Sequence, residues 1–294
     1  MTSPRVRSFS NAGLTFDVID EGPIDGPIAI LLHGFPQRGA SWNQVARILH
    51  GQGIRTLAPD QRGYSPAARP RRRAAYRLEN LASDITALIE QVREPGHPER
   101  DKVHVVGHDW GAVVAWVVAG RTDLVASLTA VSVGHPRAFL KSMLGRQALM
   151  SWYIGAFQVP GLPERVLSDP GRAGQALRGM GMTPEMVATF HGDIVEYGAL
   201  RGGLGWYRAL PLSHPRVLKG RVEVPTTMVW SDRDAALGRR APELSERYVD
   251  APFELQVLEG VSHWVPDEVP DVLAEIVCER IGSAGNGRMR RAGH

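Results

Sequence analysis

One short stretch constrains this chain of 294 residues more than any other. An apolar run ends at Val106, the turn Gly-His-Asp-Trp-Gly follows, and a longer apolar run begins after Gly111. The first run predicts a buried strand and the second a buried helix. Glycine on both flanks permits a turn too tight for side chains, which raises Asp109 above the sheet beside a helix N-terminus, where negative charge is favoured. A plain strand–turn–helix with a capping aspartate is the alternative interpretation.

The turn resembles the nucleophile elbow of α/β-hydrolases, with aspartate at a position where serine is more common. In that fold, the N–H group of the residue after the nucleophile forms an oxyanion hole with an N–H group from the loop after an earlier strand. Residues 28–32 form such an earlier apolar run, and His-Gly-Phe-Pro follows it. The resemblance therefore assigns the oxyanion hole to the backbone N–H groups of Phe35 and Trp110.

Apolar runs suitable for strands alternate with helical patterns along most of the chain. The expected strands cover residues 14–20, 28–32, 54–58, 103–106, 127–133, 225–230 and 253–258. The expected helices cover residues 41–50, 76–92, 111–120, 137–150, 184–200, 241–249 and 268–281. Alternation of this kind predicts an α/β fold with a mostly parallel sheet and helices on both faces. The resemblance to the nucleophile elbow implies that this is the α/β-hydrolase fold.

The alternation breaks between residues 135 and 219, where proline, glycine, methionine and aromatic residues are frequent and no strand pattern appears. This segment, 135–219, predicts a helical cap domain. The cap is inserted into a core domain made of residues 1–134 and 220–282. The final residues, 283–294, are rich in glycine and arginine without periodicity, which predicts a disordered tail.

Composition limits the classes of function. The net charge of +3 arises from arginine runs in loops and in the tail, so nucleic-acid binding is not expected. The single cysteine, Cys278, excludes an internal disulfide framework and fits a reducing compartment. Residues 1–20 lack the apolar segment of a signal peptide, and no run reaches the ~18 apolar residues of a membrane span. We therefore expect a cytoplasmic protein with no nucleic-acid or membrane partner.

A nucleophile at Asp109 needs an acid and a histidine later in the chain. The strand at 225–230 leads into Ser-Asp-Arg-Asp, and the strand at 253–258 leads into a loop that contains His263. Both loops follow strand carboxyl ends, where ligands bind in open α/β sheets. We interpret His263 as the base and Asp234 as the residue that orients it, with Asp232 as the alternative acid. A loop histidine held only by structural hydrogen bonds is the competing interpretation.

Four motifs resemble those of α/β-hydrolase-fold epoxide hydrolases, and the resemblance covers nearly the whole chain. They are HGFP at 33–36, DQRGYSP at 60–66, GHDWGA at 107–112 and GVSHW at 260–264. In the second motif, Asp60 and Arg62 are expected to pair with each other. The acid strand reads WSDRD, where WGxxD is commoner in the family, so the choice between its two aspartates stays open.

Epoxide hydrolases of this type carry two cap tyrosines that hydrogen-bond the epoxide oxygen. The stretch Gly-Trp-Tyr-Arg is similar to one tyrosine motif, with Gly205 in place of the usual asparagine, and implies Tyr207. The stretch 151–164 is similar to the other motif and implies Tyr153. For either tyrosine alone, a packing role is the competing interpretation. Cap aromatic residues suggest an apolar substrate pocket, and the expected lining residues are Trp152, Phe157, Phe190 and Trp206.

The resemblance implies a two-step reaction. Asp109 opens an epoxide to give an alkyl ester, and water activated by His263 hydrolyses that ester to a vicinal diol. The implied partners are a small apolar epoxide and water, and neither a metal nor an organic cofactor is expected. The sequence is compatible with a monomer or a homodimer.

Haloalkane and haloacid dehalogenases share the aspartate nucleophile and are the nearest alternative. The haloalkane type usually has asparagine after His-Gly, where this chain has Phe35. The haloacid type usually has arginine after the nucleophile, where this chain has Trp110. A non-catalytic ligand-binding protein with the same fold is an alternative of another class, but an intact set of nucleophile, acid, base and tyrosines argues against it. Aspartate at 109 disfavours a serine esterase.

Overall fold

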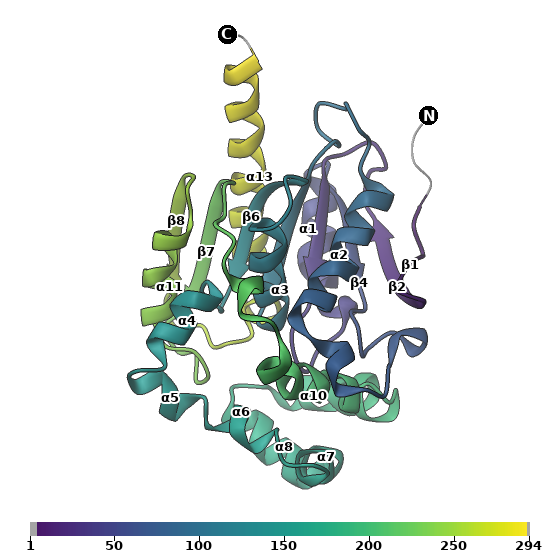
Figure 1. Ribbon diagram of the computed structural model, residues 1–294, viewed down its shortest axis with the longest axis vertical. Coiled ribbons are helices and arrows are strands. Elements are labelled where there is room, and N and C mark those ends of the chain that lie inside the picture. Colours follow the sequence, from purple (N-terminus) through teal and green to yellow (C-terminus); the bar gives the residue numbers. More distant parts are fainter. Residues whose placement is uncertain (1–4, 293–294) are drawn as a thin grey trace.

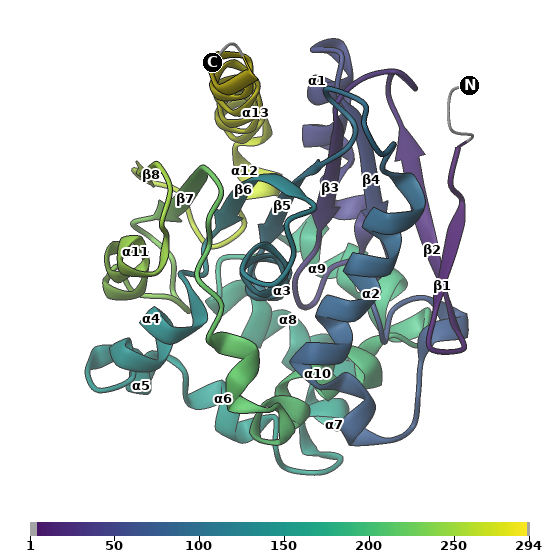
Figure 2. The same ribbon diagram turned by 45° about the horizontal axis from the view of Figure 1, so that its top comes forward.

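A twisted sheet between two layers of helices forms the centre of the computed structural model, which describes the backbone of residues 5–292 and the side chains of residues 5–284 (Figures 1 and 2). The eight strands of the described chain are β1 (Ser8–Asn11), β2 (Leu14–Glu21), β3 (Ile28–Leu32), β4 (Arg55–Pro59), β5 (Val103–His108), β6 (Val125–Val131), β7 (Thr226–Ser231) and β8 (Phe253–Leu258). Their order in the sheet is β1-β2-β4-β3-β5-β6-β7-β8.

The sheet is antiparallel only at one edge. β1 and β2 form an antiparallel pair, and β2 also pairs antiparallel with β4, whereas every pair from β4 to β8 is parallel. The central strands β3, β5 and β6 are buried along their whole length, as expected for apolar runs covered on both faces. The predicted α/β fold is therefore confirmed. The short edge strand β1 was not predicted, and β6 begins two residues before its predicted start.

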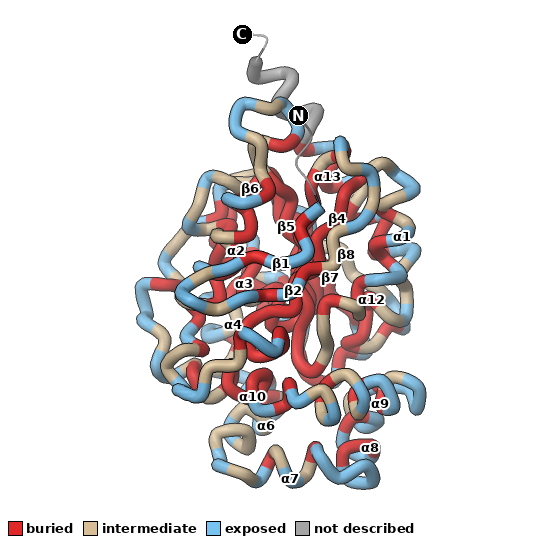
Figure 3. The backbone as a smooth tube through the Cα atoms, turned by 90° about the vertical axis from the view of Figure 1, so that its right-hand side faces the viewer, coloured by how far each residue is buried: buried red, intermediate tan, exposed pale blue. Residues whose placement is uncertain are grey.

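Two groups of helices cover the two faces of the sheet. α2 and α3 pack together on one face, and α1 and α13 pack together on the other (Figure 2). Along the described chain the helices are α1 (Asn43–Gly51), α2 (Leu78–Val92), α3 (Trp110–Ala119), α4 (Pro136–Ser142), α5 (Arg146–Met150), α6 (Trp152–Ala156), α7 (Leu162–Ser168), α8 (Pro170–Gly179), α9 (Pro184–Phe190), α10 (Leu200–Ala209), α11 (Arg240–Ser245), α12 (Val265–Glu268) and α13 (Pro270–Ala292). Buried residues concentrate along the strands (Figure 3).

The chain between β6 and β7 forms only helices and turns, which we call the helical segment, residues 136–218. It lies at the end of the molecule opposite both termini (Figure 1). The single helix predicted over 137–150 is two helices, because the chain breaks at Gly145 between α4 and α5. The helix predicted over 184–200 is interrupted by a π-helix at His191–Glu196. Within residues 5–292, no helix combines the length and apolar character required to cross a bilayer.

The predicted disordered tail is corrected for residues 283–292, because α13 continues to Ala292. Glycine is frequent there and weakens a helix, but no proline follows Pro270. Nothing in the sequence therefore blocks the hydrogen bonds that extend a helix already started by its packed first turns. Residues 293–294 of the predicted tail lie outside the described residues.

The loop after β4 departs from the predicted pairing of Asp60 with Arg62. The carboxylate of Asp60 binds the Arg38 guanidinium, with a shortest distance of 2.7 Å, and also accepts the Gly39 N–H. Arg62 instead forms a buried ion pair with Asp84 of α2, with 2.6 Å between Nη2 and Oδ1. The side chains of Asp60 and Arg62 point in different directions from this tight loop. Each therefore pairs with a charged group of a different helical layer and not with the other.

Two glycines make the turn after β5 possible. A Cβ atom on Gly107 would lie 2.3 Å from the carbonyl oxygen of Gly111. A Cβ atom on Gly111 would lie 2.0 Å from the carbonyl oxygen of Leu32 in β3. Because both obstacles are backbone atoms, neither can move aside without displacing α3 or β3. The glycines let α3 start directly against the sheet.

We expect Gly111→Ala to lower the free energy of unfolding by about 2 kcal/mol or more, because the added methyl group forces β3 and α3 apart. Denaturant unfolding followed by circular dichroism measures this change. Gly51→Ala is the matched control, since a Cβ atom at that helix end meets nothing within 4 Å. Equal stability of the Gly111→Ala and Gly51→Ala variants would contradict the close approach described above.

Candidate active site

Asp109 stands at the end of β5 in a backbone conformation that side-chain-bearing residues rarely adopt. Its φ is 51° and its ψ is −120°, and it immediately precedes α3. A conformation of this kind costs on the order of 1–3 kcal/mol and is held only where the surroundings impose it. The carboxylate is buried, and its Oδ1 accepts the Phe35 N–H at 2.8 Å. Oδ1 is thus held, while Oδ2 faces His263.

Burial destabilises the charged form of this carboxylate, whereas one positive group and two N–H donors stabilise it. Burial raises the pKa of Asp109 above its ordinary value, while His263 and the backbone N–H groups of Trp110 and Phe35 act to lower it. These two N–H groups are the ones that the sequence assigns to an oxyanion hole. They lie where they can stabilise negative charge on Oδ1.

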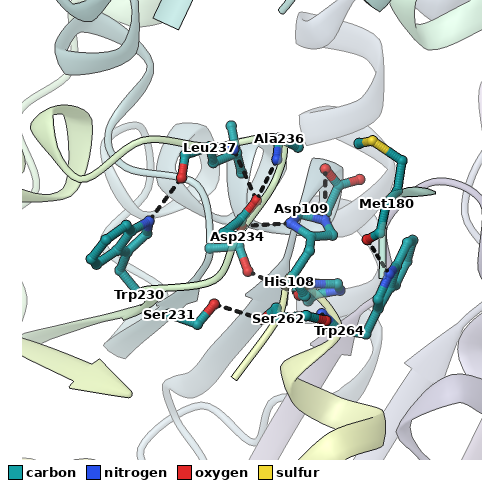
Figure 4. A network of polar contacts seen from close by, with 12 residues as sticks. His108, Asp109, Met180, Trp230, Ser231, Asp234, Ala236, Leu237, Ser262 and Trp264 are labelled. Atoms are coloured by element: carbon teal, nitrogen blue, oxygen red, sulfur yellow. Dashed lines mark hydrogen bonds and ion pairs between the residues drawn. The ribbon is translucent and has the colours of Figure 1, made fainter. Parts of the chain in front are cut away.

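His263 lies between two carboxylates. Its Nδ1 is 2.7 Å from Oδ2 of Asp234, and its Nε2 is 3.7 Å from Oδ2 of Asp109. The other oxygen of Asp234 accepts the N–H groups of Ala236 and Leu237, each at 2.8 Å (Figure 4). This hydrogen bonding fixes the Asp234 carboxylate toward the histidine ring.

The neighbouring Asp232 has a different role. Its carboxylate accepts the Gly260 N–H at 2.7 Å and is exposed. It therefore stabilises the loop after β8 from its solvent-exposed side. The geometry favours Asp234 over Asp232 as the partner of His263, because only Asp234 lies within hydrogen-bond distance of the ring.

Both carboxylates act on the proton affinity of His263. Burial alone lowers its pKa, but the charge of Asp234, the hydrogen bond to it and the charge of Asp109 outweigh burial and raise the pKa to about 9. At neutral pH, His263 is therefore protonated as long as Asp109 is charged. Any reaction that neutralises Asp109 removes one of the charges that hold this proton.

Two tyrosines of the helical segment face the same carboxylate from the opposite side. The rings of Tyr153 (α6) and Tyr207 (α10) lie 6.0 Å apart, nearly perpendicular to each other. For both hydroxyls, burial is the largest cause of a raised pKa, and the charge of Asp109 raises it further. Both phenols are therefore neutral at physiological pH and can donate hydrogen bonds.

Two apolar cavities meet at these three residues. One, of about 350 Å³, and another, of about 340 Å³, share Asp109, Tyr153 and Tyr207 in their walls. His263 and Phe157 line the first, and the second extends between α4 and the turn at 213–218. Such volumes and apolar walls are typical of sites for small organic molecules. Within residues 5–284, no group of three His, Cys, Asp or Glu side chains could hold a metal ion.

Comparison with known proteins agrees with this geometry. Residues 29–276 match the model of the family described as the alpha/beta hydrolase family. The chain belongs to the α/β-hydrolase family. A curated relative, the AB hydrolase superfamily protein YfhM of Bacillus subtilis, is 33% identical, over 91% of this chain and 94% of its own length.

Several relatives of this hydrolase are named epoxide hydrolases. Human epoxide hydrolase 4 is 30% identical, over 91% of this chain and 75% of its own length. The crystal structure of epoxide hydrolase A from Mycobacterium thermoresistibile superposes with a TM-score of 0.79 at 25% identity, over 93% of this chain and 96% of that one. The resemblance found in the sequence motifs is thus confirmed at the level of the family.

The hydrolase places two of the four predicted pocket residues away from the cavities. Phe190 is buried in α9 and borders a separate polar cleft of about 530 Å³, between the loop after β3 and α9. Trp206 is buried as well, stacks on His33 and donates its indole N–H to the Arg62 carbonyl oxygen. Neither side chain is in the walls of the two cavities: Phe190 faces the other cleft, and Trp206 points to a different side of α10 than its neighbour Tyr207. Phe157 lines the first cavity, and Trp152 borders it while remaining mostly exposed.

Sequence analysis missed the donors that position the loop carrying His263. The His108 Nε2 is 2.8 Å from the His263 carbonyl oxygen, and the Ser132 hydroxyl donates to the same oxygen at 3.3 Å. The Ser231 hydroxyl donates to the carbonyl oxygen of Ser262 at 2.7 Å (Figure 4). Because a carbonyl accepts, His108 is the Nε2–H tautomer, and burial lowers its pKa well below the ordinary value. Its place directly before Asp109 was the only available signal.

We expect Asp109→Asn to lower the pKa of His263, because it removes one of the charges that raise this pKa to about 9. Titration of the ring protons by NMR measures the shift. Asp232→Asn is the control, since Asp232 contacts Gly260 and not the ring. A His263 that titrates identically in the Asp109→Asn variant and in the unmodified protein would contradict this coupling.

The same raised pKa predicts a pH dependence of stability. The folded-state pKa of His263, about 9, lies above its ordinary value of 6.5. The stabilising contribution of protonated His263 is therefore complete below about pH 6.5 and is lost as the pH rises through about 9. His263→Gln should remove this part of the pH dependence in denaturant unfolding.

Proposed function

We propose that this protein is an epoxide hydrolase that converts an apolar epoxide and water into a vicinal diol. The observation that carries the proposal is the arrangement across the junction of the two cavities. A carboxylate with one held oxygen faces two neutral phenols, those of half-buried Tyr153 and buried Tyr207, and a histidine lies beside its free oxygen. The named epoxide hydrolases among its relatives support the same conclusion.

In the first step, Oδ2 of Asp109 attacks a ring carbon of the epoxide. The carbon–oxygen bond of the ring breaks, and its electron pair moves to the epoxide oxygen. An alkoxide is a poor leaving group near neutral pH, so it needs a general acid. Tyr153 and Tyr207 donate hydrogen bonds to this oxygen, and one of them transfers its proton. The product is an alkyl ester of Asp109.

In the second step, formation of the ester changes the proton affinity of His263. Ester formation neutralises Asp109 and so removes one cause of the raised pKa of His263. His263 then gives its proton to the tyrosine that became a phenolate in the first step, which restores that tyrosine and frees Nε2 to accept a proton from water. The resulting hydroxide attacks the ester carbonyl carbon, and the Phe35 and Trp110 N–H groups stabilise the oxyanion on Oδ1. Collapse breaks the ester bond, the leaving alkoxide takes the proton from His263 and departs as the diol, and the carboxyl proton of Asp109 passes to His263, which restores the starting state.

The substrate class follows from the cavities, and we propose that the helical segment acts as a cap over them. An epoxide bound at Asp109 places the substituents of its two ring carbons in different cavities of similar volume. We therefore assign to this enzyme apolar epoxides substituted on both carbons.

The single cysteine fits action in the cytoplasm.

We expect His263→Gln to carry out the first step and stop at the ester. With a disubstituted apolar epoxide, intact-protein mass spectrometry should show a mass gain equal to that of the substrate. The double variant Asp109→Ala/His263→Gln is the control and should show no adduct. Normal diol formation by His263→Gln would exclude this mechanism.

We expect Tyr153→Phe and Tyr207→Phe each to lower kcat by about 10²-fold, the lower end of the range for general acids. The ring stays in place, so packing is retained and only the donor is lost. Steady-state diol formation measures kcat, and Phe157→Tyr is a control that alters a cavity ring without removing either donor. Unchanged kcat in both phenylalanine variants would show that the tyrosines only pack.

A dehalogenase would use the same Asp109 and His263, so the two activities need a direct comparison. Trp110 lines the second cavity, but its ring packs on Tyr207 and Trp206. Assays of halide release from haloalkanes, beside assays of diol formation, distinguish the two. Ligand binding without turnover of either compound class would instead indicate a binding protein.

A further inference from the structure

Large apolar side chains are exposed almost entirely on one part of the molecule. Among the described side chains, all such residues except Val272 belong to the helical segment. The most exposed are Leu144 at 90%, Leu149 at 79% and Trp152 at 72%. Leu140 and Leu162 are also more than half exposed. Exposed apolar side chains that concentrate in one segment are typical of an interaction surface.

Positive charge accompanies this apolar surface. Between residues 136 and 182, six side chains are basic and two are acidic, so the formal charge is +4, whereas the whole chain carries +3. All six basic side chains are exposed: Arg137, Lys141, Arg146, Arg165, Arg172 and Arg178. Arg137 and Lys141 lie over the ring of Tyr248, so the four other arginines are the ones without this contact. The two acidic side chains are already engaged. Glu164 pairs with Arg208, and Asp169 accepts the Arg172 N–H at the start of α8.

The exposed apolar residues also border the entrances to the active site. Trp152 and Leu162 line the first cavity, and Leu140 lines the second. Helices α6, α7 and α8 form the end of the molecule farthest from both termini (Figures 1 and 3). We call the exposed side of α4 to α8 the outer face. It combines apolar anchors, basic side chains and access to the cavities.

We propose that the outer face docks on an anionic lipid surface, with Leu144, Leu149 and Trp152 in the headgroup region and the basic side chains among the lipid phosphates. Surface-bound amphipathic helices use this combination of Leu or Trp with Lys and Arg. Basic side chains near an anionic leaflet are attracted to its headgroups, and several of them together hold a protein on the lipid surface. This binding lies on the surface and requires no spanning helix. It replaces the expectation, drawn from the sequence, that the protein has no membrane partner.

A second copy of the chain is a poorer partner for the same face. A twofold dimer brings identical patches together, which would place two +4 surfaces against each other. A bilayer with anionic headgroups neutralises that charge and also accepts the apolar side chains. Charge complementarity therefore favours lipid over self-association.

Sedimentation with vesicles tests the proposal. We expect the protein to bind vesicles of equal parts phosphatidylcholine and phosphatidylglycerol at least about tenfold more strongly than vesicles of phosphatidylcholine alone, and to dissociate as salt is raised. Leu144→Ser/Leu149→Ser should lower binding to the anionic vesicles by about tenfold, because it removes two anchors. Arg165→Glu/Arg172→Glu should do the same by reversing two charges.

Two matched controls remove equivalent groups elsewhere. Val272→Ser alters an exposed apolar side chain of α13, and Arg121→Glu reverses an exposed charge after α3. Both should leave vesicle binding unchanged. Full binding by Leu144→Ser/Leu149→Ser, or binding to both vesicle types alike, overturns the proposal. The proposal is also overturned if the unmodified protein dimerises as its concentration rises and does not bind vesicles, while Leu144→Ser/Leu149→Ser stays monomeric. A second copy of the chain would then be the partner of the outer face.

A further consequence rests on the proposed function. If epoxides reach the cavities from the lipid phase, Leu144→Ser/Leu149→Ser should slow hydrolysis of a lipid-soluble epoxide supplied in anionic vesicles. The same variant should hydrolyse a water-soluble epoxide at the normal rate, since neither leucine lines a cavity. Vesicle binding without any hydrolysis would refute the enzymatic function alone. Hydrolysis without vesicle binding would refute the docking surface alone.

Discussion

A carboxylate removed from water must have its charge balanced by neighbouring groups, and this requirement explains the organisation of the site. Asp109 obtains two backbone N–H groups and a protonated histidine, and the histidine is in turn held by a second carboxylate. These groups come from the loops after β3, β5, β7 and β8, which a parallel sheet brings to one edge. The order of the strands is thus what allows a buried, charged carboxylate at this position.

Much of this arrangement could be predicted from local sequence. Gly107 and Gly111 permit a turn that has no room for a side chain at either position, and the buried strands appear as continuous apolar runs, so both the fold and the place of Asp109 follow from short-range rules. The order of nucleophile, acid and base led to His263 and to two candidate acids. The choice between Asp232 and Asp234 needed coordinates, because it depends on which carboxylate turns inward to the ring and which turns outward to Gly260.

Long-range contacts explain what the sequence did not reveal. Trp206 and Phe190 have the composition of pocket residues, but their side chains leave their helices toward other partners. Asp60 and Arg62 are close in sequence and still bind different elements, because an ion pair is stronger with a partner that is shielded from water. The hold of His108 on the His263 carbonyl is likewise invisible in sequence, since it links residues 155 positions apart.

The division of labour between sheet and helical segment has a consequence for how such a protein can change. The groups proposed to clear the ester all stand on sheet loops, whereas the phenols and most of the cavity walls belong to the insertion. Exchanging the helical segment would therefore alter which compounds enter the cavities and which bonds are opened. The groups proposed to hydrolyse the ester would remain in place. New specificities are accessible to this scaffold by replacing a single contiguous segment.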